Sequence, residues 1–195
     1  LKNLNYDELK NMAKTPEDKQ FFMVLDKIYD EEKGYSNKKS DSGGPTNFGV
    51  TQKTYDAFCK KYNLPVKDVK NLSKAETVQV YYNDYWKKSG AYKVGNPIAA
   101  TLIMDMAVNN GPVLAKKYYE KSGGDLHKFI ELRRQRYADI TKEYENGNVD
   151  DKIKAQNYKG WMNRMDRQEK MLNDYENYKR HLKNPSNQSS ESSER

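Results

Sequence analysis

The sequence predicts an all-α protein, and three observations support this prediction. Segments with apolar residues at helical spacing follow one another along the chain. Helix-start signals such as Thr15-Pro16 and Ser73-Lys74-Ala75-Glu76 precede them. No segment shows the strict alternation of a half-buried strand. Residues 34–50 are rich in Gly, Ser, Asn and Pro and allow a loop or a small hairpin, so the class is all-α, or α+β at most through that hairpin.

The N-terminal half contains four predicted helices. They cover residues 5–13, 16–33, 52 to about 62 and 74 to about 88. Thr15 is the expected N-cap of the second helix, which begins with a proline and should end at Gly34. Ser73 and Glu76 form the pattern of a capping box at the start of the fourth helix.

The C-terminal half contains four more predicted helices. Asn96-Pro97 opens a helix to about residue 110 that is apolar almost all round, which is typical of a buried central helix. A short helix follows Gly111-Pro112, and longer ones end near residue 146 and at Lys183, with Gly160 as a candidate interruption of the last. The last helix has a near-heptad seam made by Trp161, Met165, Gln168, Leu172, Tyr175 and Leu182.

Composition narrows the classes of function. The net charge is +7, which suits a polyanion such as an acidic cell wall, but Lys and Arg never run beyond a pair and no nucleic-acid motif is present. No apolar run approaches the length of a membrane span, and no signal peptide is visible. The single cysteine, Cys59, permits no intrachain disulfide. His127 and His181 lack a metal-binding pattern, so we expect no metal and no cofactor.

Glu32 is the most informative residue. On a helical wheel it points where the apolar residues of its helix point, whereas Asp30 and Glu31 point elsewhere. A carboxyl group held among apolar groups near the negative end of a helix keeps its proton more readily, as a general acid must. The alternative is a helix end whose last acid reaches solvent or pairs with a lysine.

The loop after Glu32 has the composition of a sugar-binding site. Asp41, Thr46 and Asn47 supply hydrogen-bonding groups, and Tyr35 and Phe48 supply flat surfaces that suit a sugar ring. Glycoside hydrolysis needs a second group to position water or to stabilise the transition state, and Asp41 is the natural partner of the glutamate. Ordinary turn chemistry is the alternative for Asp41.

Several motifs resemble, in order, those of glycoside hydrolase family 108, which contains lysozyme-like muramidases of phages and bacteria. They are EKGY at residues 32–35, DSGGPTNFGVT at 41–51, YNDYW at 82–86, DMAVNNG at 105–111 and GWMNR at 160–164. Two features depart from the family pattern. Lys33 stands where the motif has a glycine, and residues 112–136 lack a recognisable Asp-Gly pair.

The resemblance implies a lysozyme-like fold and cleavage of the β-1,4 bond between N-acetylmuramic acid and N-acetylglucosamine. The catalytic glutamate of the family falls on Glu32. With it we expect Asp41, helped by Thr46 or Asn47, to hold water or to stabilise the oxocarbenium-like state. The residues expected to contact the sugars are Tyr35, Asn47, Phe48, Asn109 and Trp161. A helix cap is an equal alternative for Asn109, and a core position is the more common role for a residue like Trp161.

The expected organisation has four parts. Residues 1–15 form an N-terminal extension, 16–92 the lysozyme-like glycosidase portion, 93–183 a peptidoglycan-binding-like helical portion that completes the same body, and 184–195 a disordered tail or linker. The expected partner is the glycan strand of peptidoglycan, and the last helix and tail suit a virion or larger-chain partner. The expected site of action is the periplasm or cell wall, for a phage-encoded or secreted bacterial protein.

Two other functions stay open. One is a non-catalytic module that binds the cell wall or belongs to a virion or secretion apparatus. The other is a lytic transglycosylase, which uses one glutamate and leaves an anhydro sugar.

Overall fold

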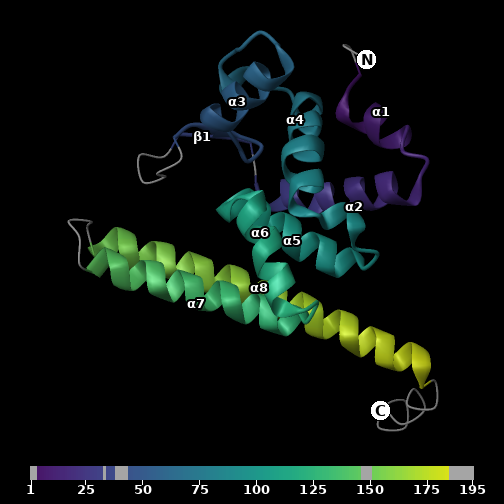
Figure 1. The fold of residues 1–195 in the computed structure, drawn as a ribbon, viewed down its shortest axis with the longest axis vertical. Coiled ribbons are helices and arrows are strands. Elements are labelled where there is room, and N and C mark those ends of the chain that lie inside the picture. The colour runs from purple at the N-terminus through teal and green to yellow at the C-terminus, as the bar shows by residue number, and fades with distance from the viewer. Residues whose placement is uncertain (1–3, 33, 38–43, 146–150, 185–195) are drawn as a thin grey trace, which may run out of the picture. The chain divides into compact units, whose positions relative to one another are not determined.

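The computed structural model describes residues 4–32, 34–37, 44–145 and 151–184. The chain divides into two compact units, Leu1–Tyr118 and Tyr119–Arg195. Helices dominate both units, and the strands are confined to one small sheet in the first (Figure 1). The predicted fold class, all-α with a small hairpin after the first long helix, is confirmed.

The first unit is built from short helices around one central helix. Its helices are α1 (Tyr6–Asn11), α2 (Pro16–Glu31), α3 (Gln52–Tyr62), α4 (Lys74–Val80) and α5 (Pro97–Asn110), and α6 (Pro112–Ser122) begins in it. Two 3₁₀ turns, Val69–Asn71 and Ala91–Lys93, were not expected from the sequence. The predicted fourth helix continues past α4 as a π-helix, Tyr81–Lys87.

The predicted helix starts are confirmed. They could be predicted because each cap involves residues that are close in the sequence. The Thr15 side chain accepts a hydrogen bond from the Asp18 N–H, and Ser73 and Glu76 form the capping box at α4. Asn96 caps α5, whose residues 99–107 are all buried. That burial agrees with the prediction of a central helix.

The end of α2 differs from the prediction. The helix ends at Glu31, and Glu32 is its C-cap, with φ −100° and ψ 77°. The chain leaves the helix early because it must enter the first strand at Tyr35, and Gly34 makes that turn with φ +57°. The Glu32 N–H still donates to the Ile28 carbonyl at 2.8 Å, so its Cα remains on the helical path. The helical hydrogen-bond pattern therefore extends one residue beyond the end of the helix.

A three-stranded antiparallel sheet follows α2. Its strands are β1 (Tyr35–Ser36), β2 (Thr46–Asn47) and β3 (Val50–Thr51), in the order β1-β2-β3. Tyr35 pairs with Asn47, and Asn47 pairs with Val50 on its other side. The central strand thus ties the start of α3 to the end of α2.

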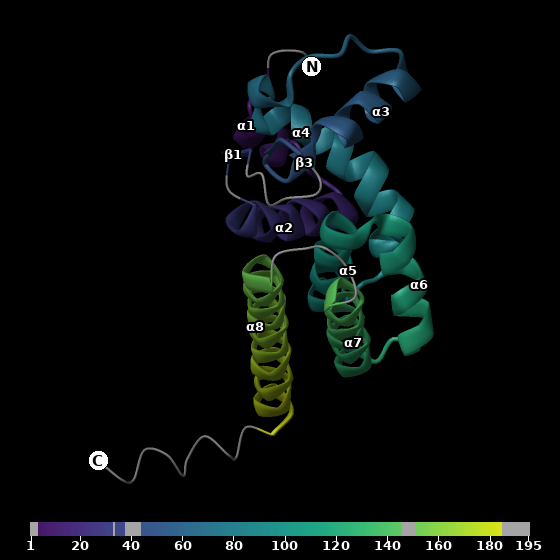
Figure 2. The same cartoon turned by 90° about the vertical axis from the view of Figure 1, so that its left-hand side faces the viewer.

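The second unit is a pair of helices, α7 (Leu126–Glu145) and α8 (Asp151–Lys183), which pack along each other (Figures 1 and 2). Helix α8 runs through Gly160 without the interruption that the sequence suggested. Met165, Gln168 and Leu172 of the predicted seam are buried, whereas Leu182 is 60% exposed.

The register of the two helices explains why the end of the seam is exposed. His127, near the start of α7, lies 3.1 Å from the Glu176 carboxylate of α8. The residues of α8 after Glu176 therefore extend past the start of α7. Among the described residues of the whole chain, none of the helices is long and apolar enough to cross a membrane.

Candidate active site

Glu32 lies half-buried at the end of α2, directly against the turn between β2 and β3. A Cβ atom built on Gly49 would lie 3.0 Å from Cγ and 3.1 Å from Cβ of Glu32. The aliphatic part of the glutamate therefore occupies the space that a side chain at Gly49 would need. The absence of a side chain at Gly49 therefore leaves room for Glu32.

The turn itself has an unusual backbone. Phe48 and Gly49 form a two-residue hairpin loop, and both have positive φ, 49° and 79°. This is the pattern of a type I′ turn, which matches the twist of the two strands. Phe48 is held in this conformation by two hydrogen bonds: its N–H donates to the Gly34 carbonyl at 3.1 Å, and its carbonyl accepts from the Tyr81 hydroxyl at 2.6 Å.

Two tyrosines of the π-helix lie near enough to the glutamate for its charge to affect their pKa values. Burial raises the pKa of Tyr81 well above its ordinary value, and the charges of Tyr29, Tyr85 and Glu32 add to this effect. Burial also raises the pKa of Tyr85, against a hydrogen bond with Thr54, and Glu32 again contributes. Both phenols therefore stay protonated and neutral near Glu32.

The loop residues predicted to bind sugar differ in how far they are exposed to solvent. Tyr35 is 44% exposed on β1, so its ring is accessible. Thr46 and Phe48 are half-buried, and the Phe48 ring packs edge-on against Tyr29 at 5.9 Å between centroids. Asn47 is buried. Its side-chain nitrogen donates to three backbone carbonyls at 3.1–3.2 Å, those of Val69, Lys70 and Leu72.

The structure therefore gives Asn47 a structural position. Its amide joins the hairpin to the 3₁₀ turn Val69–Asn71, in a region where the predicted role was contact with substrate. Sequence reasoning did not identify this role because the three acceptors are backbone groups more than twenty residues away. It also overlooked Tyr81, for which the tyrosine-rich run of residues 81–85 was the available signal.

The remaining predicted residues are taken one by one. Asp41 and Lys33 are outside the described residues. Asn109 is exposed in the last turn of α5, and its amide donates to the Asp105 carbonyl at 2.8 Å. Trp161 belongs to the second unit, where its ring stacks on Tyr137 with centroids 4.8 Å apart and planes 17° apart.

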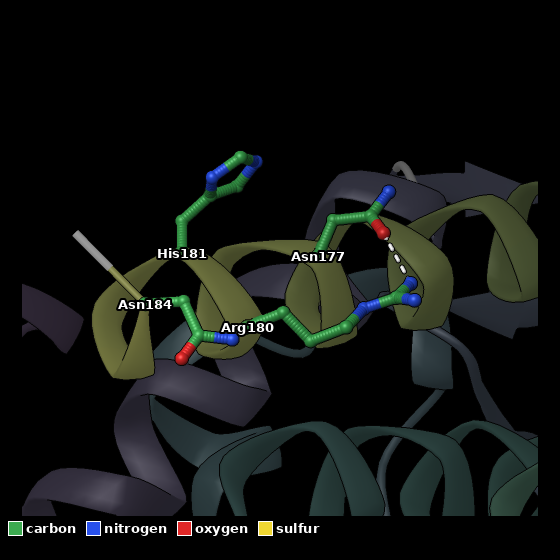
Figure 3. A pocket seen from close by; sticks show the side chains of 4 residues that line it. All are labelled: Asn177, Arg180, His181 and Asn184. Atoms are coloured by element: carbon green, nitrogen blue, oxygen red, sulfur yellow. Dashed lines mark hydrogen bonds between the residues drawn. The ribbon is translucent and has the colours of Figure 1, made fainter. Parts of the chain in front are cut away.

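A surface hollow lies on the exposed end of α8 in the second unit. It is lined by Asn177, Arg180, His181 and Asn184, and the Arg180 guanidinium donates to Asn177 (Figure 3). All four residues are exposed, so the hollow is a feature of the helix surface and not an enclosed site. Within the described part of the chain, no group of three or more His, Cys, Asp and Glu residues is placed to hold a metal ion.

Comparison with known proteins finds one family model that matches the segment containing this site. The model of glycosyl hydrolase 108 matches residues 25–111, a segment that includes Glu32, the sheet, the π-helix and α5. None of the curated proteins compared matches the chain.

Among solved structures, SagA of Brucella abortus is similar, with a TM-score of 0.57 and 23% sequence identity, over 77% of this chain and 91% of that one. This likeness concerns the fold alone. The resemblance inferred from the motifs is confirmed by the family match, in which the model of glycosyl hydrolase 108 covers residues 25–111 of this chain.

Proposed function

We propose that the chain is a peptidoglycan hydrolase of the muramidase type, with Glu32 as its general acid. The observation that carries this proposal is the placement of Glu32. It is half-buried at the end of α2, against Gly49 and near two neutral phenols, within the segment that matches a glycosidase family.

The geometry suits proton transfer to a leaving glycosidic oxygen. The glutamate's aliphatic part lies in the space left free by Gly49, and the fully buried Tyr81 places its hydroxyl beside the same glycine. A positioned general acid contributes about 10²- to 10⁴-fold in rate. Glu32 would protonate the oxygen that leaves, while a second group meets the positive charge that develops on the sugar.

Asp41 is our proposed second group, with Thr46 beside it. This assignment rests on the spacing of the loop and on the family motif. The position of Thr46 supports the assignment. This residue lies in β2, in the same small sheet whose turn lies against Glu32. Among the sugar-contact candidates, we expect Tyr35 to contribute more than Asn47, because the tyrosine ring is exposed and the amide is occupied.

The proposed substrate sets the place of action. A glycan-strand hydrolase works in the periplasm or the cell wall, and the net charge of +7 favours association with an acidic wall. We propose that the protein is encoded by a phage or secreted by a bacterium. The exposed end of α8 is the place at which a virion or larger-chain partner would bind.

The test uses purified sacculi and the full chain. Glu32→Gln removes the acid while keeping the size of the side chain, and we expect it to lower the release of reducing ends at least about 100-fold. Glu31→Gln is the matched control, because Glu31 is the adjacent acid and is exposed. Glu31→Gln should retain the wild-type rate and show that loss of one helix-end charge is harmless.

The outcomes separate the alternatives. A wild-type rate in Glu32→Gln would refute the assignment of the acid. Binding of wild-type protein to sacculi without release of reducing ends would select a non-catalytic module. Anhydro-muramic products in the mass spectrum would select a lytic transglycosylase.

A further inference from the structure

The space beside Gly49 is filled from two directions. A Cβ atom on this residue would lie 2.4 Å from Oη of Tyr81 and 3.0 Å from Cγ of Glu32. Real Cβ atoms essentially never come within 3.0 Å of another heavy atom, so one of these groups would have to move. Positive φ at Gly49 adds an independent strain for any L-residue.

Tyr81 is the less movable neighbour. Its side chain is fully buried, and its hydroxyl donates to the Phe48 carbonyl at 2.6 Å. Its ring packs edge-on against Tyr29 at 5.6 Å and lies tilted against Tyr85 at 5.3 Å. Close-packed interiors resist displacement of such a ring, so the turn would shift away from Tyr81 and displace the half-buried Glu32 that rests against it.

We infer that Tyr81 is a positioning residue for Glu32 and acts through the Phe48–Gly49 turn. The hydroxyl of Tyr81 holds the turn by its hydrogen bond to Phe48, and the bare backbone of Gly49 then forms the wall against which Glu32 rests. This inference rests on the proposed function, since it assigns to the turn the task of aiming the acid. The family match does not assign any role to Tyr81 or Gly49.

The phenol of Tyr81 does not act as a general acid in this arrangement. Its proton is engaged with a backbone carbonyl, and its pKa is raised by burial. Removing the hydroxyl should therefore leave substrate binding intact and disturb only the aim of the carboxyl group. This difference separates positioning from binding in steady-state kinetics.

The first experiment compares single substitutions by kcat and KM on soluble peptidoglycan fragments, at a temperature at which circular dichroism shows every variant folded. Tyr81→Phe should lower kcat about tenfold, and Gly49→Ala about a hundredfold, because small misplacements of a catalytic group cost rates of this order. KM should change less than about twofold for both, because uniform substrate binding is untouched.

Tyr6→Phe is the matched control. Tyr6 is also a buried tyrosine of the aromatic cluster, and its hydroxyl donates to Asp26 at 2.5 Å. It should lose stability and keep the wild-type kcat. If Tyr6→Phe and Tyr81→Phe lower kcat equally, Tyr81 is merely structural and the inference is overturned.

The second experiment is a double-mutant cycle on thermal unfolding, which needs no activity. In Gly49→Ala/Tyr81→Phe, the oxygen nearest to the new methyl group is gone, so the double variant should lose less melting temperature than the sum of the two singles. Additive losses would show that Gly49 is needed only for its φ, and would overturn the inferred contact.

The two proposals fail in different ways. Activity retained in Glu32→Gln would refute the general acid, whatever the cycle shows. An inactive Glu32→Gln together with wild-type kcat in Tyr81→Phe would leave the function standing and refute the positioning role.

Discussion

Replacing Asn47 with alanine removes the side chain that joins the hairpin to the 3₁₀ turn beside it. The amide is 5% exposed, and its nitrogen lies 3.1–3.2 Å from three carbonyl oxygens. A side-chain amide has two N–H groups, so the three acceptors share two donors. Each hydrogen bond contributes about 1 kcal/mol net, and each buried carbonyl left without a donor costs about 1–3 kcal/mol. We therefore expect Asn47→Ala to lower the free energy of unfolding of the first unit by roughly 3 kcal/mol.

Urea unfolding followed by tryptophan fluorescence measures this loss. Trp86 is fully buried in the first unit and Trp161 belongs to the second, so a Trp161→Phe background reports on the first unit alone. Asn71→Ala is the control, since Asn71 lies in the same 3₁₀ turn with its side chain exposed. It should change stability by less than about 0.5 kcal/mol.

A loss below about 0.5 kcal/mol in Asn47→Ala would refute this reasoning, because the three contacts would then contribute no more than an exposed residue. Normal stability combined with weakened binding to glycan fragments would instead restore the sugar-contact role predicted from the sequence. The experiment thus decides between two roles for one amide.

Two further predictions concern stability. Burial raises the pKa of Tyr29, Tyr81 and Tyr85, so the folded protein holds these protons more tightly than the unfolded chain, in which tyrosine has a pKa of about 10. This contribution to the free energy of unfolding is fully present below about pH 9. Above about pH 10 it should fall by as much as 1.4 kcal/mol per pH unit for each tyrosine. A urea midpoint that stays constant up to about pH 11 would contradict this prediction. Separately, Ser73→Ala removes the acceptor for the Glu76 N–H at 3.2 Å, and thermal unfolding should show a loss of about 1 kcal/mol, whereas no loss would mean that the capping box is redundant.

The helix starts could be predicted from the sequence because their causes lie within a few residues. Thr15, Ser73 and Asn96 each accept from an N–H two or three positions ahead. The backbone position of Glu32 was predictable for a similar reason. Its N–H keeps the helical hydrogen bond to Ile28 even though the helix ends one residue earlier.

The surroundings of Glu32 could not be predicted in the same way, because they depend on contacts between distant segments. Tyr81 reaches Phe48 across 33 positions, and Asn47 reaches the 3₁₀ turn across 22 or more. The spacing of apolar residues does not reveal a π-helix. Asp41 remains a prediction, since it lies outside the described residues.

The π-helix has a consequence for how this protein can diverge. Tyr81, at the start of the π-helix, donates a hydrogen bond to the turn that lies against Glu32. Trp86, near its end, packs in the core with its ring centroid 5.5 Å from that of Phe21. A π-helix fits more residues into each turn than an α-helix does, and losing one residue would rotate everything after it by about 100°. Substitutions in this segment can be accommodated one side chain at a time. A single-residue insertion or deletion would detach either Tyr81 or Trp86 from its neighbour, so the structure restricts the length of this segment more strictly than the identity of its other side chains.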